Sequence, residues 1–208
     1  MGLGPLLDGT HSSHGVLHYA HPSLLRLGAA QLETCWWVPL LFGVAGTILG
    51  VGHPLLDDRD EGVSDEVASP GRARAALAVG AFSSQYWLSG ELAARTAAAA
   101  GGQALPLAEH AAGVDAPLAA AALALWLGFD RTRGGLFLCA LTGVCGPLIE
   151  AALINGLHLY EYTWPDEGFL GTPSWICWVY AGGAPAVGAV GRLIRGELAR
   201  SPAEGRAR

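Results

Sequence analysis

Three charged residues at the junction of two apolar runs are the first candidates for chemistry in this sequence. Asp130, Arg131 and Arg133 separate an Ala- and Leu-rich run, residues 116–128, from an uncharged run, residues 136–149. A carboxylate at the edge of a bilayer is costly without a partner, so we expect Arg131 or Arg133 to pair with Asp130. The cluster fits two situations: an ordinary charged helix end facing the cytosol, and a docking point for the membrane helix or loop of a partner protein.

Glu150 is a second candidate because it falls near the middle of an apolar segment, residues 136–160. A carboxylate at that depth costs about 3 kcal/mol even on insertion scales, so we expect it to face the interior of a helix bundle. There it would be protonated, or hydrogen-bonded to Gln85, Ser89 or Asn155. Three roles fit this residue: an interhelical hydrogen bond, a polar anchor inside a lipid cavity, and a proton carrier.

Glycines recur at spacings that let membrane helices pack closely. Helices in lipid associate through close backbone contact, so small residues are typical of their interfaces. The glycines that we expect to pack helices together are Gly46, Gly50, Gly182, Gly183, Gly188 and Gly191. The same faces would also suit a partner helix or a sterol.

Motifs for catalysis or cofactor binding are absent from the sequence, which has no P-loop, dinucleotide fingerprint, serine nucleophile elbow or HExxH. Four N-terminal histidines recur at roughly helical spacing, but no cysteine or carboxylate completes a metal site. They are His11, His14, His18 and His21. The four cysteines form no CxxC pair, so we expect free thiols. We predict a protein that is not an enzyme and holds neither a metal nor a cofactor.

The elements that must position these residues are long apolar segments. The 208-residue chain is 51% hydrophobic and only 14% charged, whereas a soluble domain is nearer ~25% charged. Apolar runs of about 20 residues are typical of membrane-spanning helices. The predicted spans are residues 36–56, 75–97, 114–129, 136–160 and 175–194. The sequence therefore predicts an all-α fold, a polytopic transmembrane helical bundle with five clear spans.

Charge divides the chain into three regions and orients it. We expect residues 1–35 to be a polar, interfacial or disordered segment, residues 36–195 the transmembrane domain, and residues 196–208 a cytosolic polar tail. All 12 basic residues are arginine, and with the C-terminus in the cytosol only Arg26 and Arg95 fall on the opposite side. The arginines form no stripe of the kind that binds nucleic acid.

Short motifs in a fixed order resemble the Insig (insulin-induced gene) family of membrane proteins. Trp36-Trp37-Val38-Pro39 and Pro54-Leu55-Leu56-Asp57 are similar to the start and end of a family membrane helix. The central match runs from Leu125-Trp126 through Phe129-Asp130-Arg131-Thr132-Arg133 to Gly135. Further matches, in order, are Asn155-Gly156, Tyr162-Thr163, Pro165-Asp166, Phe169-Leu170, Ser174-Trp175, Gly182-Gly183, Val187-Gly188 and Val190-Gly191-Arg192. The resemblance covers roughly residues 36–195, without a clear counterpart of the family's first helix.

The resemblance implies an endoplasmic-reticulum protein with six membrane helices, which binds oxysterol and retains partners that carry a sterol-sensing domain. These partners are Scap, the escort of the SREBP transcription factors, and HMG-CoA reductase. In the family, the Asp matching Asp130 is needed for partner binding and the Trp matching Trp126 lies by the sterol cavity, where bacterial relatives hold a diacylglycerol-like lipid. We expect partner contacts at Asp130, Arg131 and Arg133, and a cavity lined by Trp126, Gln85, Glu150 and Asn155.

The resulting hypothesis is a non-enzymatic, oxysterol-binding regulator of sterol metabolism. Two alternatives stay open: a diacylglycerol-type lipid-binding protein without Scap, and a small proton-coupled transporter that uses Glu150. Plastid or bacterial inner membranes are alternatives to the endoplasmic reticulum, since a plant, algal or bacterial branch of the family fits the sequence. The glycine-rich faces also suit a homo-oligomer.

Overall fold

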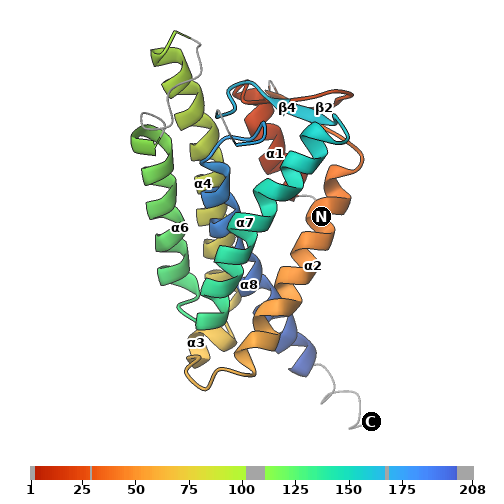
Figure 1. Ribbon diagram of the computed structural model, residues 1–208. Coiled ribbons are helices and arrows are strands. Elements are labelled where there is room, and N and C mark those ends of the chain that lie inside the picture. Colours follow the sequence, from red (N-terminus) through yellow and green to blue (C-terminus); the bar gives the residue numbers. More distant parts are fainter. Residues whose placement is uncertain (1–2, 29, 102–110, 167–168, 201–208) are drawn as a thin grey trace.

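Helices make up most of the structure. The computed structural model describes residues 3–28, 30–101, 111–166 and 169–200 (Figure 1). The helices are α1 (Leu3–Ser13), α2 (Val38–Asp57), α3 (Asp65–Ala68), α4 (Arg72–Ala99), α6 (Ala116–Phe129), α7 (Arg133–Asn155) and α8 (Ile176–Arg200). A π-helical turn, Ala111–Asp115, leads directly into α6. The predicted all-α polytopic bundle is confirmed, and each predicted span corresponds to one of the helices α2, α4, α6, α7 and α8.

α8 occupies the middle of the bundle, and α2, α4, α6 and α7 pack around it (Figure 1). Three segments of the described chain are long and apolar enough to cross a membrane: Val38–Asp57, Ala111–Phe129 and Arg133–Asn155. These segments turn most of their surface outward, where lipid requires apolar side chains. α8 is enclosed by protein instead, and it can therefore carry glycines, a proline and a buried arginine.

Close contact fixes α8 against its neighbours at two glycines, against backbone at Gly191 and against a side chain at Gly182. A Cβ atom on Gly191 would lie 2.0 Å from the carbonyl oxygen of Gly50 on α2, and one on Gly182 would lie 1.9 Å from Oε1 of Gln85 on α4. Gly183 and Gly188 also face side chains of neighbouring helices. Gly46 differs from the expectation, because no atom of the described residues lies within 4 Å of its Cβ position and it borders a groove between α2 and α8.

The N-terminal segment is more ordered than the sequence indicated. α1 is followed by β1 (Leu17–Tyr19), β2 (Ser23–Leu27) and β3 (Ala30–Thr34), and β4 (Tyr160–Tyr162) follows α7. β1 pairs antiparallel with β4, and β2 pairs antiparallel with β3. With 11 residues, α1 is too short to span a bilayer, and it packs on α4, α2 and β3 at the end of the bundle away from α3.

The predicted linker and tail are only partly described. Residues 101–113, rich in Gly and Ala, are expected from their composition to link the second and third spans, and residues 102–110 of this linker lie outside the described residues. Residues 201–208 of the expected tail lie outside them too. Residues 196–200 continue α8 as its last turn rather than forming a separate tail.

Candidate lipid cavity and the buried charge network beside it

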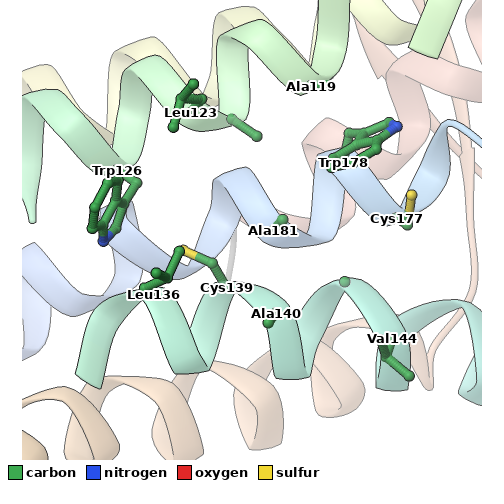
Figure 2. Close-up of a pocket in the computed structure, with 12 residues that line it drawn as sticks. Ala119, Leu123, Trp126, Leu136, Cys139, Ala140, Val144, Cys177, Trp178 and Ala181 are labelled. Atoms are coloured by element: carbon green, nitrogen blue, oxygen red, sulfur yellow. The ribbon is translucent and has the colours of Figure 1, made fainter. Parts of the chain in front are cut away.

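An apolar cavity of about 390 Å³ lies between α6, α7 and α8 (Figure 2). Its wall is made of small and apolar side chains: Ala119, Ala122, Leu123, Trp126, Leu136, Cys139, Ala140, Gly143, Val144, Cys177, Trp178 and Ala181. The volume is within the range of small-molecule sites, which are mostly apolar with a few polar groups. Such a wall suits the body of a lipid.

Two indole rings stand at opposite ends of this cavity (Figure 2). The Trp126 indole Nε1 donates to the carbonyl oxygen of Thr132 over 3.2 Å. The Trp178 indole Nε1 donates to Asp115 Oδ1 over 3.1 Å, and Ser174 donates its hydroxyl to the other oxygen of Asp115. Each ring is therefore held in place by a polar contact made outside the apolar space.

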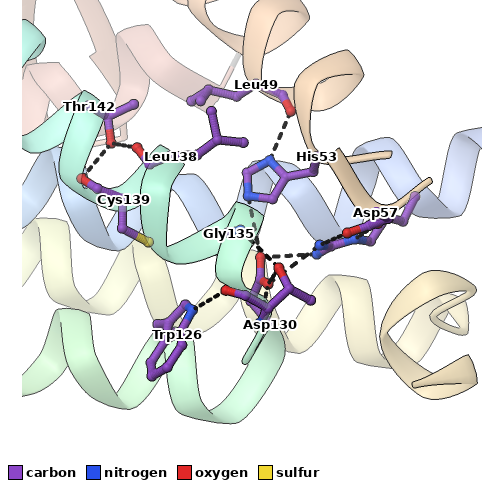
Figure 3. A network of polar contacts seen from close by, with 11 residues as sticks. Leu49, His53, Asp57, Trp126, Asp130, Gly135, Leu138, Cys139 and Thr142 are labelled. Atoms are coloured by element: carbon purple, nitrogen blue, oxygen red, sulfur yellow. Dashed lines mark hydrogen bonds and ion pairs between the residues drawn. The ribbon is translucent and has the colours of Figure 1, made fainter. Parts of the chain in front are cut away.

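Asp130 lies behind the Trp126 end of the cavity, in a buried charge network (Figure 3). The Asp130 carboxylate is 0% exposed, and Arg192 of α8 reaches it with Nη1 at 3.1 Å. The same guanidinium donates from Nε and Nη2 to both oxygens of Asp57, at 2.6 and 2.8 Å. His53 of α2 completes the network with Nε2 3.3 Å from Asp130 Oδ2. We call Asp57, Asp130, Arg192 and His53 the charge network.

Opposing effects set the charge of Asp130. Burial alone would raise the pKa of its carboxyl, but the hydrogen bonds from His53 and Arg192 and the guanidinium charge outweigh burial and hold the pKa well below its usual value. The network is thus stabilising at neutral pH and weakens only as the pH falls through that lowered pKa. His53 Nδ1 also lies 2.9 Å from the Leu49 carbonyl oxygen, so both ring nitrogens face acceptors.

The expected pairing of Asp130 with its sequence neighbours is wrong. Asp130 bonds to Arg192 and His53, whereas Arg131 is exposed and donates its Nε to the carbonyl oxygen of Leu127. Arg133 is exposed as well. The partner lies 62 residues away on the central helix, and no motif or spacing pattern links it to Asp130.

Glu150 and the other polar residues expected beside Trp126 lie elsewhere. Glu150 is buried and accepts hydrogen bonds of 2.7 Å from the hydroxyls of both Tyr162 and Tyr180, instead of pairing with Gln85, Ser89 or Asn155. The Gln85 amide donates to the carbonyl oxygens of Leu118 and Trp178, and the Asn155 amide donates to those of Ala151 and Leu170. The structure therefore brings none of the three into the cavity that Trp126 lines.

A second carboxyl, partly buried, also accepts tyrosyl hydroxyls. Asp8 of α1 accepts hydrogen bonds from the hydroxyls of Tyr19 and Tyr86. Tyr160 packs between Tyr19 and Tyr162, with ring centroids 5.8 and 6.1 Å away. All five tyrosines of the chain thus gather around Asp8 and Glu150, although they are scattered from residue 19 to residue 180. Sequence reasoning missed this cluster because no spacing pattern links its members.

Asp8 should make stability depend on pH. Burial raises the pKa of its carboxyl to about 6, and the hydrogen bond from Tyr86 offsets only part of that. Because the pKa of Asp8 is higher in the folded than in the unfolded state, its protonated carboxyl stabilises the folded protein. This stabilisation is fully present below pH ~4 and is lost as the pH rises through ~6. The unfolding temperature of the wild type, measured relative to Asp8→Asn, should therefore fall by several degrees between pH 4.5 and 7.5. A constant difference would contradict this expectation, and Asp60→Asn, at an exposed loop carboxylate that bonds only to Gly62 N in the described residues, serves as the control.

These features define the class of the protein: a polytopic membrane protein with an apolar cavity between its helices and a buried charge network at one end. The family model of insulin-induced protein (INSIG) matches residues 1–194. The chain therefore belongs to the Insig family, and the match includes the 35 N-terminal residues that the short motifs did not reach.

Relatives support the same assignment. Insulin-induced gene 1 protein of Danio rerio is 30% identical over 163 residues, which are 78% of this chain and 57% of that protein. The Homo sapiens protein of that name is 29% identical over 167 residues, 80% of this chain and 53% of that protein. The chain thus spans a little over half the length of these relatives.

Solved structures agree on the fold. The crystal structure of a mycobacterial Insig homologue from Mycobacterium vanbaalenii matches with a TM-score of 0.69 at 21% identity, over 96% of this chain and 89% of that one. A cross-linked trimer of that homologue matches with a TM-score of 0.68 at 22% identity.

Proposed function

We propose that this protein is a non-enzymatic membrane regulator that binds a sterol in the cavity between α6, α7 and α8. In this role it retains sterol-sensing-domain proteins of the Scap and HMG-CoA reductase type in the endoplasmic-reticulum membrane. Family membership supports the regulatory role, and its relatives are named insulin-induced gene proteins. A diacylglycerol-type lipid is the alternative ligand of the same cavity.

The observation that carries the proposal is the shape and chemistry of the cavity wall. Five of its members are alanine or glycine: Ala119, Ala122, Ala140, Gly143 and Ala181. They leave a smooth slot bounded by the two indoles, which favours a rigid, flat ring system over flexible chains. Affinity would come mainly from burial of apolar surface, at roughly 25 cal/mol per Å².

The transporter alternative has less support. Both carboxylate oxygens of Glu150 accept tyrosyl hydroxyls, one from β4 and one from α8. These bonds favour a structural role for the carboxyl, and the one from Tyr180 on α8 is an interhelical hydrogen bond, the first of the roles considered for Glu150.

Filling the cavity should abolish ligand binding. Ala140→Phe, which projects a ring into the slot, should weaken the binding of a labelled oxysterol by about tenfold or more, measured on protein in nanodiscs. Ala152→Phe is the matched control, since Ala152 is exposed on α7 away from this cavity and its variant should bind as the wild type does. Labelled diacylglycerol, run in parallel, identifies the preferred ligand.

Native thiols give an independent map of the site. Cys139 and Cys177 line the cavity, whereas Cys145 lies on α7 outside it. Bound ligand should slow the alkylation of Cys139 and Cys177 by a small membrane-permeant reagent and leave Cys145 unchanged. Absence of saturable binding by either lipid, or equal protection of all three thiols, would overturn the cavity assignment.

Partner retention needs a test of its own. Because Asp130 is buried, we propose that the exposed Arg131 and Arg133 supply the direct contacts at this junction. Co-purification of a sterol-sensing-domain protein should fall when both are replaced by alanine, and unchanged recovery would remove this role. Homo-oligomers, suggested by the trimeric form of the mycobacterial homologue, would appear as higher-mass species in native mass spectrometry.

A further inference from the structure

We infer that Asp130 positions the cavity wall: it holds the turn at Thr132 and, through that turn, the indole of Trp126. The lipid cavity, the turn and Asp130 would then be one coupled unit, to which the rest of the charge network contributes little. This inference deepens the proposed function and rests on it for the identity of the ligand. It assigns Asp130 a role as a positioning residue behind the cavity, in place of a surface contact.

Burial is the first step of the argument. The Asp130 side chain is 0% exposed, and donors surround it on all sides: the amide and hydroxyl of Thr132, the guanidinium of Arg192 and the imidazole of His53. A carboxylate in this position has no surface to offer to another protein. Any effect of Asp130 on a partner must therefore pass through the residues that it holds.

A continuous set of hydrogen bonds leads from Asp130 to the cavity (Figure 3). Asp130 Oδ1 accepts from the Thr132 amide at 3.0 Å and from the Thr132 hydroxyl at 2.5 Å. The carbonyl oxygen of Thr132 in turn accepts from the Trp126 indole. The amides of Asp130 and Arg131 both donate to the Trp126 carbonyl oxygen at 3.0 Å. Trp126 is thus bound to the turn through both its backbone and its side chain.

The turn also sets the first residues of α7. The Thr132 hydroxyl accepts from the Gly135 amide at 2.8 Å and so caps the helix, and a Cβ on Gly135 would lie 2.2 Å from Asp130 Oδ1. Arg131, inside the turn, has φ 62°, a conformation that non-glycine residues rarely adopt. A ligand that displaces the Trp126 ring would consequently displace the exposed Arg131 as well.

Asp57 provides a matched comparison within the same charge network. It also bonds to Arg192, with distances of 2.6 and 2.8 Å, but it does so from the last turn of α2. In the described residues its side-chain bonds go to Arg192 alone, and none reaches Thr132 or Trp126. A variant at Asp57 therefore disturbs the charge network without touching the route to the cavity.

The first experiment needs no ligand. In protein labelled with ¹⁵N-tryptophan, the indole resonance of Trp126, assigned by its loss in Trp126→Phe, should shift in Asp130→Asn and stay in place in Asp57→Asn. Thr132→Val removes the hydroxyl contact but keeps the charge network, and it should also shift the Trp126 resonance. This variant replaces Asp130→Asn in the experiment if Asp130→Asn does not fold. Thr142→Val is its control, since the Thr142 hydroxyl bonds only within α7 and to the Tyr180 carbonyl. An unmoved Trp126 resonance, or an equal shift in Asp57→Asn, would overturn the inference.

The second experiment measures the coupling. Asp130→Asn and Trp126→Phe should each weaken the binding of labelled oxysterol by about fivefold, as expected for the loss of one buried hydrogen bond. If the residues act through one another, the double variant should lose little more than either single variant, whereas independent residues would lose about 25-fold together. Asp57→Asn should stay within about twofold of wild type. Additive losses would contradict the coupling; failure of the wild type to bind would instead reject the proposed ligand and leave the resonance experiment decisive.

Discussion

Arg192→Met should lower the thermal unfolding temperature of the detergent-solubilised protein by roughly 6–20 °C. Methionine fills much of the space, but it leaves the carboxylates of Asp57 and Asp130 without their shared guanidinium, and both are almost fully buried. Removing one partner of a buried charge cluster costs about 3–5 kcal/mol, because the remaining charge is uncompensated. For a domain of 150–250 residues each kcal/mol corresponds to about 2–4 °C.

Arg195→Met is the matched control for this result. Arg195 lies on the same helix and pairs with Asp58, but both side chains are about half exposed, and exposed pairs contribute little. Its unfolding temperature should change by less than about 4 °C. Equal losses in the two variants would show that the charge network is not the source of the stability assigned to it.

Gly191→Ala should be nearly as damaging. The added methyl group would meet the backbone of Gly50, and a backbone atom cannot turn aside as a flexible side chain can. α2 and α8 would have to separate, which would also pull Arg192 away from Asp57. Overpacking of this kind typically costs about 1–3 kcal/mol.

Gly46→Ala should not destabilise the protein, in contrast to Gly191→Ala. Gly46 lies four residues before Gly50 on α2, but its Cβ position is open in the described residues. Alanine is favoured over glycine inside a helix by about 1 kcal/mol, so this variant should be neutral or slightly more stable. Thermal unfolding of both variants under one detergent condition decides the matter, and a loss in Gly46→Ala that equals the loss in Gly191→Ala would refute the role given to close contact.

The helices were predictable because they depend on local composition, whereas their contacts were not. Apolar runs predicted each end of the spans to within six residues, since the bilayer imposes length and apolarity directly. The partner of Asp130 depends on how α8 is rotated in the centre of the bundle, and neither spacing nor charge count carries that information. Arg131 and Arg133 are close in sequence, but the turn directs Asp130 inward and leaves both arginines outside.

The cavity was only partly predictable for the same reason. Trp126 was expected beside it through the family resemblance, and it does line the apolar slot. Gln85, Glu150 and Asn155 were chosen because polar residues within apolar runs must face protein, and all three do form hydrogen bonds to protein. The direction in which each one faces depends on helix register and on partners such as the tyrosines of β4 and α8, which composition does not determine.

The central position of α8 has a consequence for biosynthesis. α8 follows α2, α4, α6 and α7 in chain order, yet it supplies the surface against which all four pack. Until it is synthesised and inserted, Asp57 and Asp130 have no guanidinium to compensate their charge, and Gly50 of α2 lacks the helix that packs against it. The positively charged α8 must therefore enter between four helices that were made before it, a step at which membrane chaperones and quality-control proteases can distinguish chains with and without this helix.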